Sequence, residues 1–342
     1  MAMFNRILGW LGRTLIAAGV ILLMFVGYQL WGTGLDEESH QEDLTREFAA
    51  TVESSDAGTN TKGTSEQDPS TIAATVAEEL SQVDPATAEA TAAPREGDPA
   101  GLISIPKIGV RNKSYVEGVS KADLRKGPGH YPGTPLPGQA GNASIAGHRT
   151  TYGAPFNRID ELVPGDQIEI YTLQGKFIYE VIESPAERRQ GAENKNWGKG
   201  WFAVNPNDTT VLEQTGENLL TLTACHPKYS AKLRIIVVAK LVAEPAASAP
   251  TTVPDLTPAE EKAKVKEQTE DLISGDSNEL TPAIAFGAAF LGFWAFIGLI
   301  VWLLRRKFPT RTWFPVYLLA SPAAIALLWL CFVHLDRFLP SY

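Results

Sequence analysis

The sequence predicts an all-β domain, closed or sandwiched and carrying short helices on its loops, together with three transmembrane helices. Between residues 101 and 242 the chain alternates short apolar runs with connections dense in Gly and Pro, which is typical of all-β domains. Three other segments, residues 14–31, 282–304 and 313–333, are apolar throughout and near the ~20 residues that cross a bilayer. A buried core helix would show charges on one face, and none of the three does.

The β signature is clearest in "DQIEIYTLQGKFIYEVIES", where Ile168 and Ile170 alternate with other residues before a turn near Gln174-Gly175. Alternation with a period of two predicts strands, and the turn predicts a hairpin. The stretches "NASIAG", "LLTLTA" and "LRIIVVAKLV" predict further short strands. Helical patterns are confined to "SKADLRKG" and "PFNRIDEL", both brief.

The flanking cations predict how the chain crosses the membrane. Arg6 and Arg13 precede the first apolar segment, and the loop "RRKFPTR" joins the other two. Because cytoplasmic loops carry the excess of Lys and Arg, residues 1–13 and 305–312 are expected in the cytoplasm and the β domain outside the cell. The first segment lacks a small-x-small cleavage site, so it is interpreted as an uncleaved anchor of a multi-pass protein in the cell membrane.

Two polar segments flank the β domain. Residues 36–98 hold sixteen acidic against three basic side chains and almost no aromatic residue, which predicts a disordered acidic tether. Residues 243–281 are interpreted as a linker. Within it, "TPAE" at 257–260 resembles a capping box with Pro at the first helical position, so a short helix is expected to about Ser274.

The chain has two cysteines, and they are predicted to lie in different environments. Cys331 falls inside the third apolar segment, where a thiol is a small apolar side chain. Cys225 ends an apolar strand in the exported domain. The two cannot pair within one molecule, and two cysteines are too few for a structural zinc site. Cys225 is therefore an unpaired thiol and a candidate nucleophile, although an isolated Cys in a strand is more often inert.

A cysteine nucleophile needs a nearby His and a donor for the developing oxyanion. His226 is adjacent in sequence, but neighbours on a strand point to opposite faces. The remaining candidates are His148, which follows an apolar strand and Gly147, and His130, which lies in a Gly/Pro loop. His148 is favoured because it stands at a strand end.

Arg234 follows Cys225 by nine residues and opens the next apolar strand. Either it points outward at a strand edge, or it faces inward and is paired; alternation alone does not decide between them. The short link "HPKYSAK" makes the two strands plausible antiparallel neighbours. Arg234 and Cys225 would then lie near the same end, within reach of one substrate carbonyl.

With these residues assembled, the domain resembles a sortase, a cysteine transpeptidase of Gram-positive cell surfaces. "LTLTAC" is similar to the family's TLxTC motif and assigns the nucleophile to Cys225. The stretch "GPGHYPGTPLPGQAGNASIAGHRTTYGAPFNRIDEL" resembles the one that carries the essential His, here His148, and Arg234 takes the place of the conserved arginine. The resemblance spans residues 101–242 and implies a closed eight-stranded β-barrel as the catalytic domain.

The stretch "AGHRTTYGAPF" is most similar to class E sortases of actinobacteria, which are associated with LAxTG sorting signals. Thr221, Thr223 and Tyr152 are the residues expected to contact substrate. The sequence departs from the family pattern at Ala224, where a Thr is usual, and this predicts the loss of one hydrogen bond near the substrate, worth about 1 kcal/mol.

The resemblance implies cleavage of an LAxTG or LPxTG signal between Thr and Gly, followed by transfer of the acyl group to an amine of peptidoglycan or its lipid-linked precursor. No metal or organic cofactor is needed, and no nucleic acid is expected as a partner. Three alternatives stay open: a class C pilin-polymerising sortase, a secreted Cys hydrolase, and a non-catalytic module that binds cell-wall peptide. Class C enzymes usually carry an Asp-Pro-aromatic lid, but here Ala100 follows Asp98-Pro99.

Overall fold

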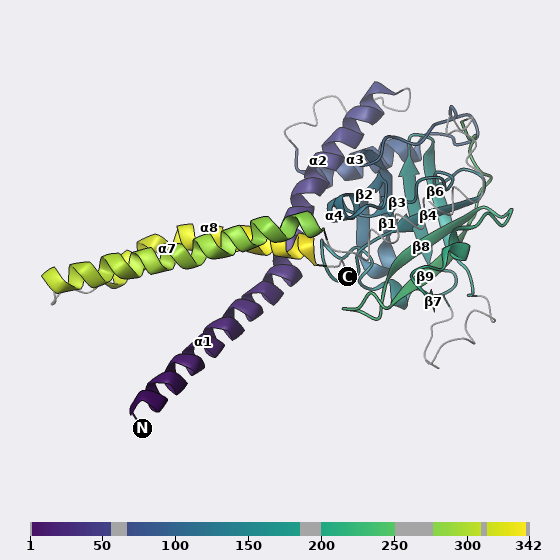
Figure 1. Ribbon diagram of the computed structural model, residues 1–342. Coiled ribbons are helices and arrows are strands. Elements are labelled where there is room, and N and C mark those ends of the chain that lie inside the picture. The colour runs from purple at the N-terminus through teal and green to yellow at the C-terminus, as the bar shows by residue number, and fades with distance from the viewer. Residues whose placement is uncertain (1, 56–66, 185–199, 250–275, 309–312, 340–342) are drawn as a thin grey trace. The chain divides into compact units, whose positions relative to one another are not determined.

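The structure, a computed structural model, describes residues 2–55, 67–184, 200–249, 276–308 and 313–339. Its contacts divide the chain into two compact units. One unit contains three long apolar helices, and the other contains the sheet and the helices packed on it (Figure 1).

The strands are β1 (Pro99–Ile105), β2 (Val110–Glu117), β3 (Gly129–His130), β4 (Asn142–Ala146), β5 (Gln167–Thr172), β6 (Gly175–Val181), β7 (Phe202–Val204), β8 (Leu219–His226) and β9 (Leu233–Leu241). The α-helices are α1 (Ala2–Gly27), α2 (Thr33–Ser54), α3 (Pro69–Ser81), α4 (Lys121–Lys126), α7 (Leu280–Lys307) and α8 (Phe314–Phe338). Short 3-10 or π turns are η1 (Tyr28–Gly32), η3 (Pro106–Ile108), η4 (Ile159–Glu161), η5 (Thr209–Leu212) and η6 (Ser277–Glu279).

Eight strands form a closed ring, which confirms the predicted barrel. Their order is β6-β5-β1-β2-β3-β4-β8-β9, and β9 closes the ring by pairing with β6. β7 is a ninth strand that pairs with the first half of β9. The predicted hairpin is present, because β5 and β6 pair from Thr172↔Gly175 to Gln167↔Glu180. Closing the ring leaves little unpaired backbone at its edges.

The barrel core separates the two faces of each strand. In β8, Leu220, Leu222 and Ala224 belong to the core cluster. Successive side chains of a strand point to opposite faces, so Thr223 and Cys225 point away from the core. The same alternation in β9 puts Ile235 and Val237 inside the barrel and Arg234 and Ile236 outside it. Both faces of β8 are largely buried, which explains why its sequence reads as one apolar run.

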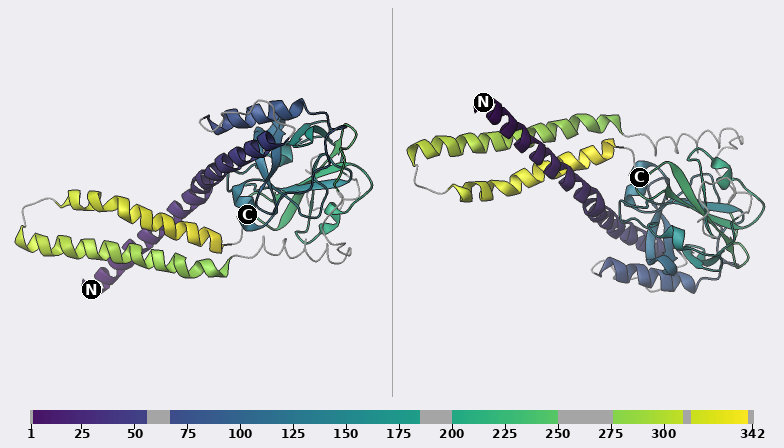
Figure 2. Two further views of the ribbon diagram at one scale, coloured as in Figure 1. Left: turned by 90° about the horizontal axis from the view of Figure 1, so that it is seen from above. Right: turned by 90° about the horizontal axis from the view of Figure 1, so that it is seen from below.

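The prediction of a disordered tether at residues 36–98 is wrong where the structure describes this segment. α2 and α3 are helices that pack beside each other against the barrel (Figures 1 and 2). Their buried side chains form a cluster with Leu102 of β1 and Tyr171 of β5. The members from the two helices are Phe48, Ala49, Val52, Ile72, Val76, Ala77 and Leu80.

The physical reason for this error is that composition was averaged over the whole segment. Ile72, Val76 and Leu80 recur every four residues, which sets them on one face of a helix, while Ala74 and Glu78 are exposed on the other face. Net charge and low mean hydropathy hide such a stripe, and only its period reveals it. Residues 56–66 lie outside the described residues.

The first residues after β9 pack against the barrel. Ala246 is buried in the core cluster, and its N–H donates to the Gly138 carbonyl at 2.9 Å. The expected helix at 257–274 lies outside the described residues. The brief helix predicted from "SKADLRKG" is present as α4, with a capping box between Ser120 and Asp123.

The helical unit confirms three helices that are long and apolar enough to cross a membrane. α1 and α7 begin before their predicted spans, at Ala2 and Leu280, whereas α8 begins one residue inside its predicted span, at Phe314, and ends beyond it, at Phe338. Aromatic side chains of α8 contact Phe25 near the end of α1 and Tyr28, the residue after α1. The ring of Phe332 lies 5.3 Å from that of Phe25, and the ring of Trp329 lies 4.9 Å from that of Tyr28.

Candidate functional site

Cys225 and Arg234 face each other across two hydrogen-bonded strands. β8 and β9 pair antiparallel, and their register matches Cys225 directly with Arg234. Directly opposite residues of an antiparallel pair have side chains on the same face, with Cβ atoms ~4.5–5.5 Å apart. The six-residue link between the strands, residues 227–232, therefore sets Arg234 beside Cys225. Both side chains are half-buried.

His148 lies just beyond β4 and is 5% exposed. β4 runs parallel to β8, with Ala146 opposite Thr223, and the N–H of Gly147 extends this pairing by donating to the Thr223 carbonyl at 3.0 Å. Continuing the same register past the end of β4 would set His148 level with Cys225. Cys225 and Arg234 thus lie on the paired strands β8 and β9, and His148 lies in the loop after the neighbouring strand β4.

A small pocket borders this outer face. Thr223 and Arg234 form part of its wall, together with Tyr131 and residues of β7 and η5. The hydroxyl groups of Tyr131 and Thr223 are 3.1 Å apart, within hydrogen-bond distance. Arg234 donates to the carbonyls of Ala231 and Leu233, both at 3.3 Å. Of the residues expected to contact substrate, Thr223 lines this pocket beside Arg234.

The other two expected contacts have different surroundings. Thr221 is 1% exposed, and its hydroxyl donates to the Asn142 side chain at 2.8 Å. Tyr152 is buried, with its ring 5.1 Å from that of His148. Thr221 therefore ties β8 to β4, and Tyr152 supports the His148 ring.

The interpretation of Ala224 is also corrected. Ala224 belongs to the barrel core, on the face opposite Cys225. A hydroxyl at this position would point inward and away from the pocket. The substitution therefore removes no hydrogen bond from the outer face.

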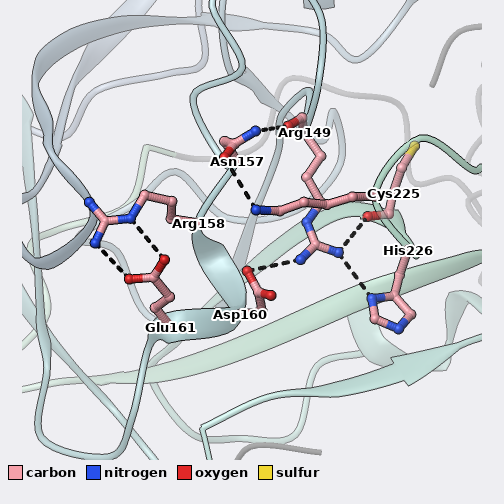
Figure 3. A network of polar contacts seen from close by, with 8 residues as sticks. Arg149, Asn157, Arg158, Asp160, Glu161, Cys225 and His226 are labelled. Atoms are coloured by element: carbon pink, nitrogen blue, oxygen red, sulfur yellow. Dashed lines mark hydrogen bonds and ion pairs between the residues drawn. The ribbon is translucent and has the colours of Figure 1, made fainter.

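Arg149, the residue after His148, belongs to the site although the sequence pattern did not predict it. Its guanidinium is 1% exposed and donates to the Cys225 carbonyl at 3.3 Å and to Nδ1 of His226 at 3.0 Å. It also forms an ion pair with Asp160 at 2.9 Å (Figure 3). Arg149 thus links the loop after β4 to the end of β8. The feature of the sequence that could have indicated this role is the charge of Arg149 just after an apolar strand, because a buried Arg must be paired.

Burial and two cations have opposite effects on the pKa of the Cys225 thiol. Burial raises the pKa of the Cys225 thiol, while the positive charges of Arg234 and Arg149 lower it, and the net shift is upward. Since an ordinary thiol has a pKa of ~8.5, the resting sulfur carries its proton at neutral pH. A nucleophilic reaction here needs a base that takes this proton as the sulfur attacks.

The other two histidines of the domain have structural contacts. Figure 3 shows the His226 imidazole and the Cys225 sulfur pointing in opposite directions, as alternation predicts. The His226 ring lies 5.4 Å from Trp201. Burial lowers the pKa of His226, and the positive charge of Arg149 lowers it further. The negative charge of Asp160 raises this pKa, but the net shift is downward. His130 is fully buried, with Nδ1 2.6 Å from the Glu117 carboxylate.

Comparison with known proteins adds independent information. A sequence profile described as the Sortase domain matches residues 103–242. Sortase SrtE1 of Streptomyces coelicolor is 29% identical over 249 residues, which cover 68% of this chain and 57% of SrtE1. Sortase D of Bacillus subtilis is 27% identical over 214 residues, covering 62% of this chain and 86% of Sortase D. The solved Sortase D5 transpeptidase of Clostridium perfringens is 36% identical, covering 44% of this chain and 82% of that one, with a TM-score of 0.36.

The matched residues run from within β1 to the residue after β9 and include every residue of the site described above. The chain spans a little over half the length of SrtE1, at 57%. The profile match and the identities to SrtE1 and Sortase D agree with the closed eight-stranded barrel. The chain belongs to the sortase family of cysteine transpeptidases.

Proposed function

We propose that this chain is a membrane-anchored transpeptidase that cleaves a C-terminal sorting signal between Thr and Gly and transfers the acyl group to a cell-wall amine. The observation that carries the proposal is the Cys225–Arg234 pair on the outer face of the barrel, beside a pocket and level with the end of β4. This arrangement combines a nucleophile, a cation for a developing oxyanion and a neighbouring imidazole on one surface.

Each side chain has a role in the proposed reaction. The Cys225 sulfur attacks the Thr carbonyl as His148 takes its proton, and Arg234 stabilises the charge on the carbonyl oxygen. His148 then protonates the departing Gly amine, and a thioester remains on Cys225. An incoming amine attacks this thioester, His148 removes a proton from that amine, and the thiol is regenerated.

The proposed substrate class is an LAxTG signal, as in class E enzymes. The stretch "AGHRTTYGAPF" and the likeness to SrtE1 support this choice over LPxTG. The acceptor is an amine of peptidoglycan or of its lipid-linked precursor.

The proposed location is the cell membrane, with the barrel outside the cell. The three long apolar helices support membrane insertion. The basic residues at the N-terminus and between α7 and α8 support a cytoplasmic N-terminus, because such residues favour the inner side of the membrane.

Class C polymerisation is disfavoured by the position of Asp98 and Pro99. Pro99 begins β1 and pairs with Val116 of β2. The Asp98 carbonyl accepts from the Glu117 N–H at 3.0 Å. This dipeptide is therefore part of the sheet, and Ala100 supplies no aromatic plug.

The proposal is tested with the full chain in detergent, incubated with LAxTG and LPxTG peptides in the presence and absence of an added amine. We expect cleavage after Thr and a product in which the amine replaces the Gly segment, with the LAxTG peptide preferred. Mass spectrometry of the products separates three outcomes. Transfer to the amine supports a transpeptidase, hydrolysis unaffected by amine indicates a Cys hydrolase, and binding without cleavage indicates a non-catalytic module.

We expect Arg149→Met to slow transfer about 100-fold, because a small displacement of reacting groups has an effect of this size. The change removes the donor to the Cys225 carbonyl and one of the two charges that lower the thiol pKa. The Cys225 pKa therefore rises further, and alkylation by iodoacetamide at pH 7.5 slows. The pH profile of alkylation measures this directly, and its midpoint should move upward.

Arg158→Met is the matched control for Arg149. Arg158 lies in the same region but is exposed and pairs with Glu161 (Figure 3). It should keep both the wild-type rate and the wild-type alkylation profile. A profile of Arg149→Met that coincides with the wild type would show that this guanidinium has no electrostatic effect on the sulfur.

A further inference from the structure

The loop after His148 has an unusual backbone. Tyr152, Gly153 and Ala154 have φ angles of +49°, +68° and +44° in succession. Left-handed conformations are unfavourable for residues other than Gly, and two of these three carry a Cβ. Such a run persists only where its surroundings hold it in place.

The surroundings are supplied by the first turns of α2. The Thr33 hydroxyl accepts a hydrogen bond from the Tyr152 N–H at 3.1 Å, and both residues are buried. The next residue, Gly153, lies against Glu37, because a Cβ added at Gly153 would overlap a Glu37 carboxylate oxygen. Two consecutive loop residues therefore contact one face of α2. Thr33 and Tyr152, which form the hydrogen bond, are 119 residues apart in the chain.

α2 is itself fixed to the barrel. The Glu37 carboxylate, 3% exposed, pairs with Lys113 of β2 at 2.7 Å. The Gln41 side chain donates to the Ser114 carbonyl at 2.9 Å and accepts from the Ser114 N–H at 3.0 Å. These contacts with β2 hold the helix at a defined position, and so define where the loop lies.

The loop in turn contacts the imidazole. The Tyr152 ring lies 5.1 Å from the His148 ring at 37° between their planes. The Thr151 hydroxyl is 3.4 Å from Nδ1 of His148. A continuous set of contacts therefore runs from α2 through Tyr152 to His148.

We propose that α2 is a positioning element of the catalytic site, in which Thr33 and Glu37 hold the Tyr152–Gly153 backbone so that His148 stays at the Cys225 end of the barrel. This rests on the proposed function of His148. Thr33 acts through the loop and touches no substrate. The active domain accordingly begins before residue 101 and includes α2.

The test compares two buried threonines of the same helix in the full chain. Thr33→Val removes the acceptor for Tyr152, whereas Thr45→Val removes a hydroxyl that is 2.9 Å from the Ser114 hydroxyl and distant in sequence from the loop contact. We expect Thr33→Val to lower kcat about 10-fold or more with little change in KM, because small misplacement of a catalytic group has effects of this order. Thr33→Ser keeps the acceptor and should restore the rate, and Thr45→Val should transfer at the wild-type rate.

A second measurement needs no substrate and therefore separates this proposal from the proposed function. Hydrogen exchange of the amides at 149–156 should be faster in Thr33→Val and unchanged in Thr45→Val. If no peptide is transferred even by the wild type, the proposed function fails while the exchange result still tests the role of α2. Equal exchange and equal rates in the two valine variants would overturn the positioning role.

Discussion

Replacing Cys225 by Ala is expected to abolish transfer of a sorting peptide to an amine, a loss of about 10⁴-fold or more because no other group can form the thioester. The barrel should remain folded, since the Cys225 side chain points away from the core and is only half-buried. Without added amine, mass spectrometry should detect the acyl group on the wild-type chain and none on the variant.

Cys331→Ala is the matched control for this experiment. Cys331 is the other cysteine of the chain and lies in α8, in the helical unit, where its sulfur contacts the Ala283 carbonyl at 3.4 Å. This variant should keep the wild-type rate and the acyl-enzyme mass. Transfer by Cys225→Ala, or an acyl group on Cys331, would contradict the assignment of the nucleophile.

Replacing His148 by Ala is expected to lower kcat by about 10² to 10⁴-fold, the usual contribution of a general acid–base. The raised pKa of Cys225 leaves the thiol protonated at neutral pH, so the attack depends on a base. The bell-shaped dependence of the rate on pH should lose the limb that His148 contributes. Measurement of kcat/KM between pH 5 and 10 checks both effects.

His226→Ala distinguishes the two histidines nearest to Cys225 in the chain. Because the pKa of His226 is lowered from its ordinary ~6.5, this imidazole is neutral at pH 7 and is a poor source of a proton for the leaving amine. Arg149 keeps its bond to the Cys225 carbonyl in this variant, so we expect less than about a tenfold loss of rate and an unchanged pH profile. An inactive His226→Ala together with an active His148→Ala would reverse the assignment.

The sequence was sufficient for the parts of the site that depend on local pattern. A strand has a period of two, so the spacing of Cys225 and Arg234 across a short link already suggested that they lie at one end of two paired strands, and the register bears this out. Alternation likewise separated His226 from the sulfur. The three apolar helices followed from length and hydropathy.

The tertiary structure was needed wherever residues far apart in the chain combine. Arg149 is evident in the sequence as a charged residue, but its contact with the Cys225 carbonyl depends on how the loop after β4 folds against β8. The same holds for Ala224, whose inward direction matters only once the core side of β8 is known.

The acidic segment shows the same division most clearly. Its sequence contains the helical stripe of α3 and the polar residues of α2, yet neither helix has a reason to be ordered without the barrel surface at Leu102 and Tyr171. Short helices are marginal in water and are stabilised by the apolar face that they bury. Local pattern alone therefore determined the barrel strands, the placement of Cys225 near Arg234 and the three long apolar helices. The folding of α2 onto the barrel, and with it the contact of α2 with the loop after His148, arises only from long-range packing.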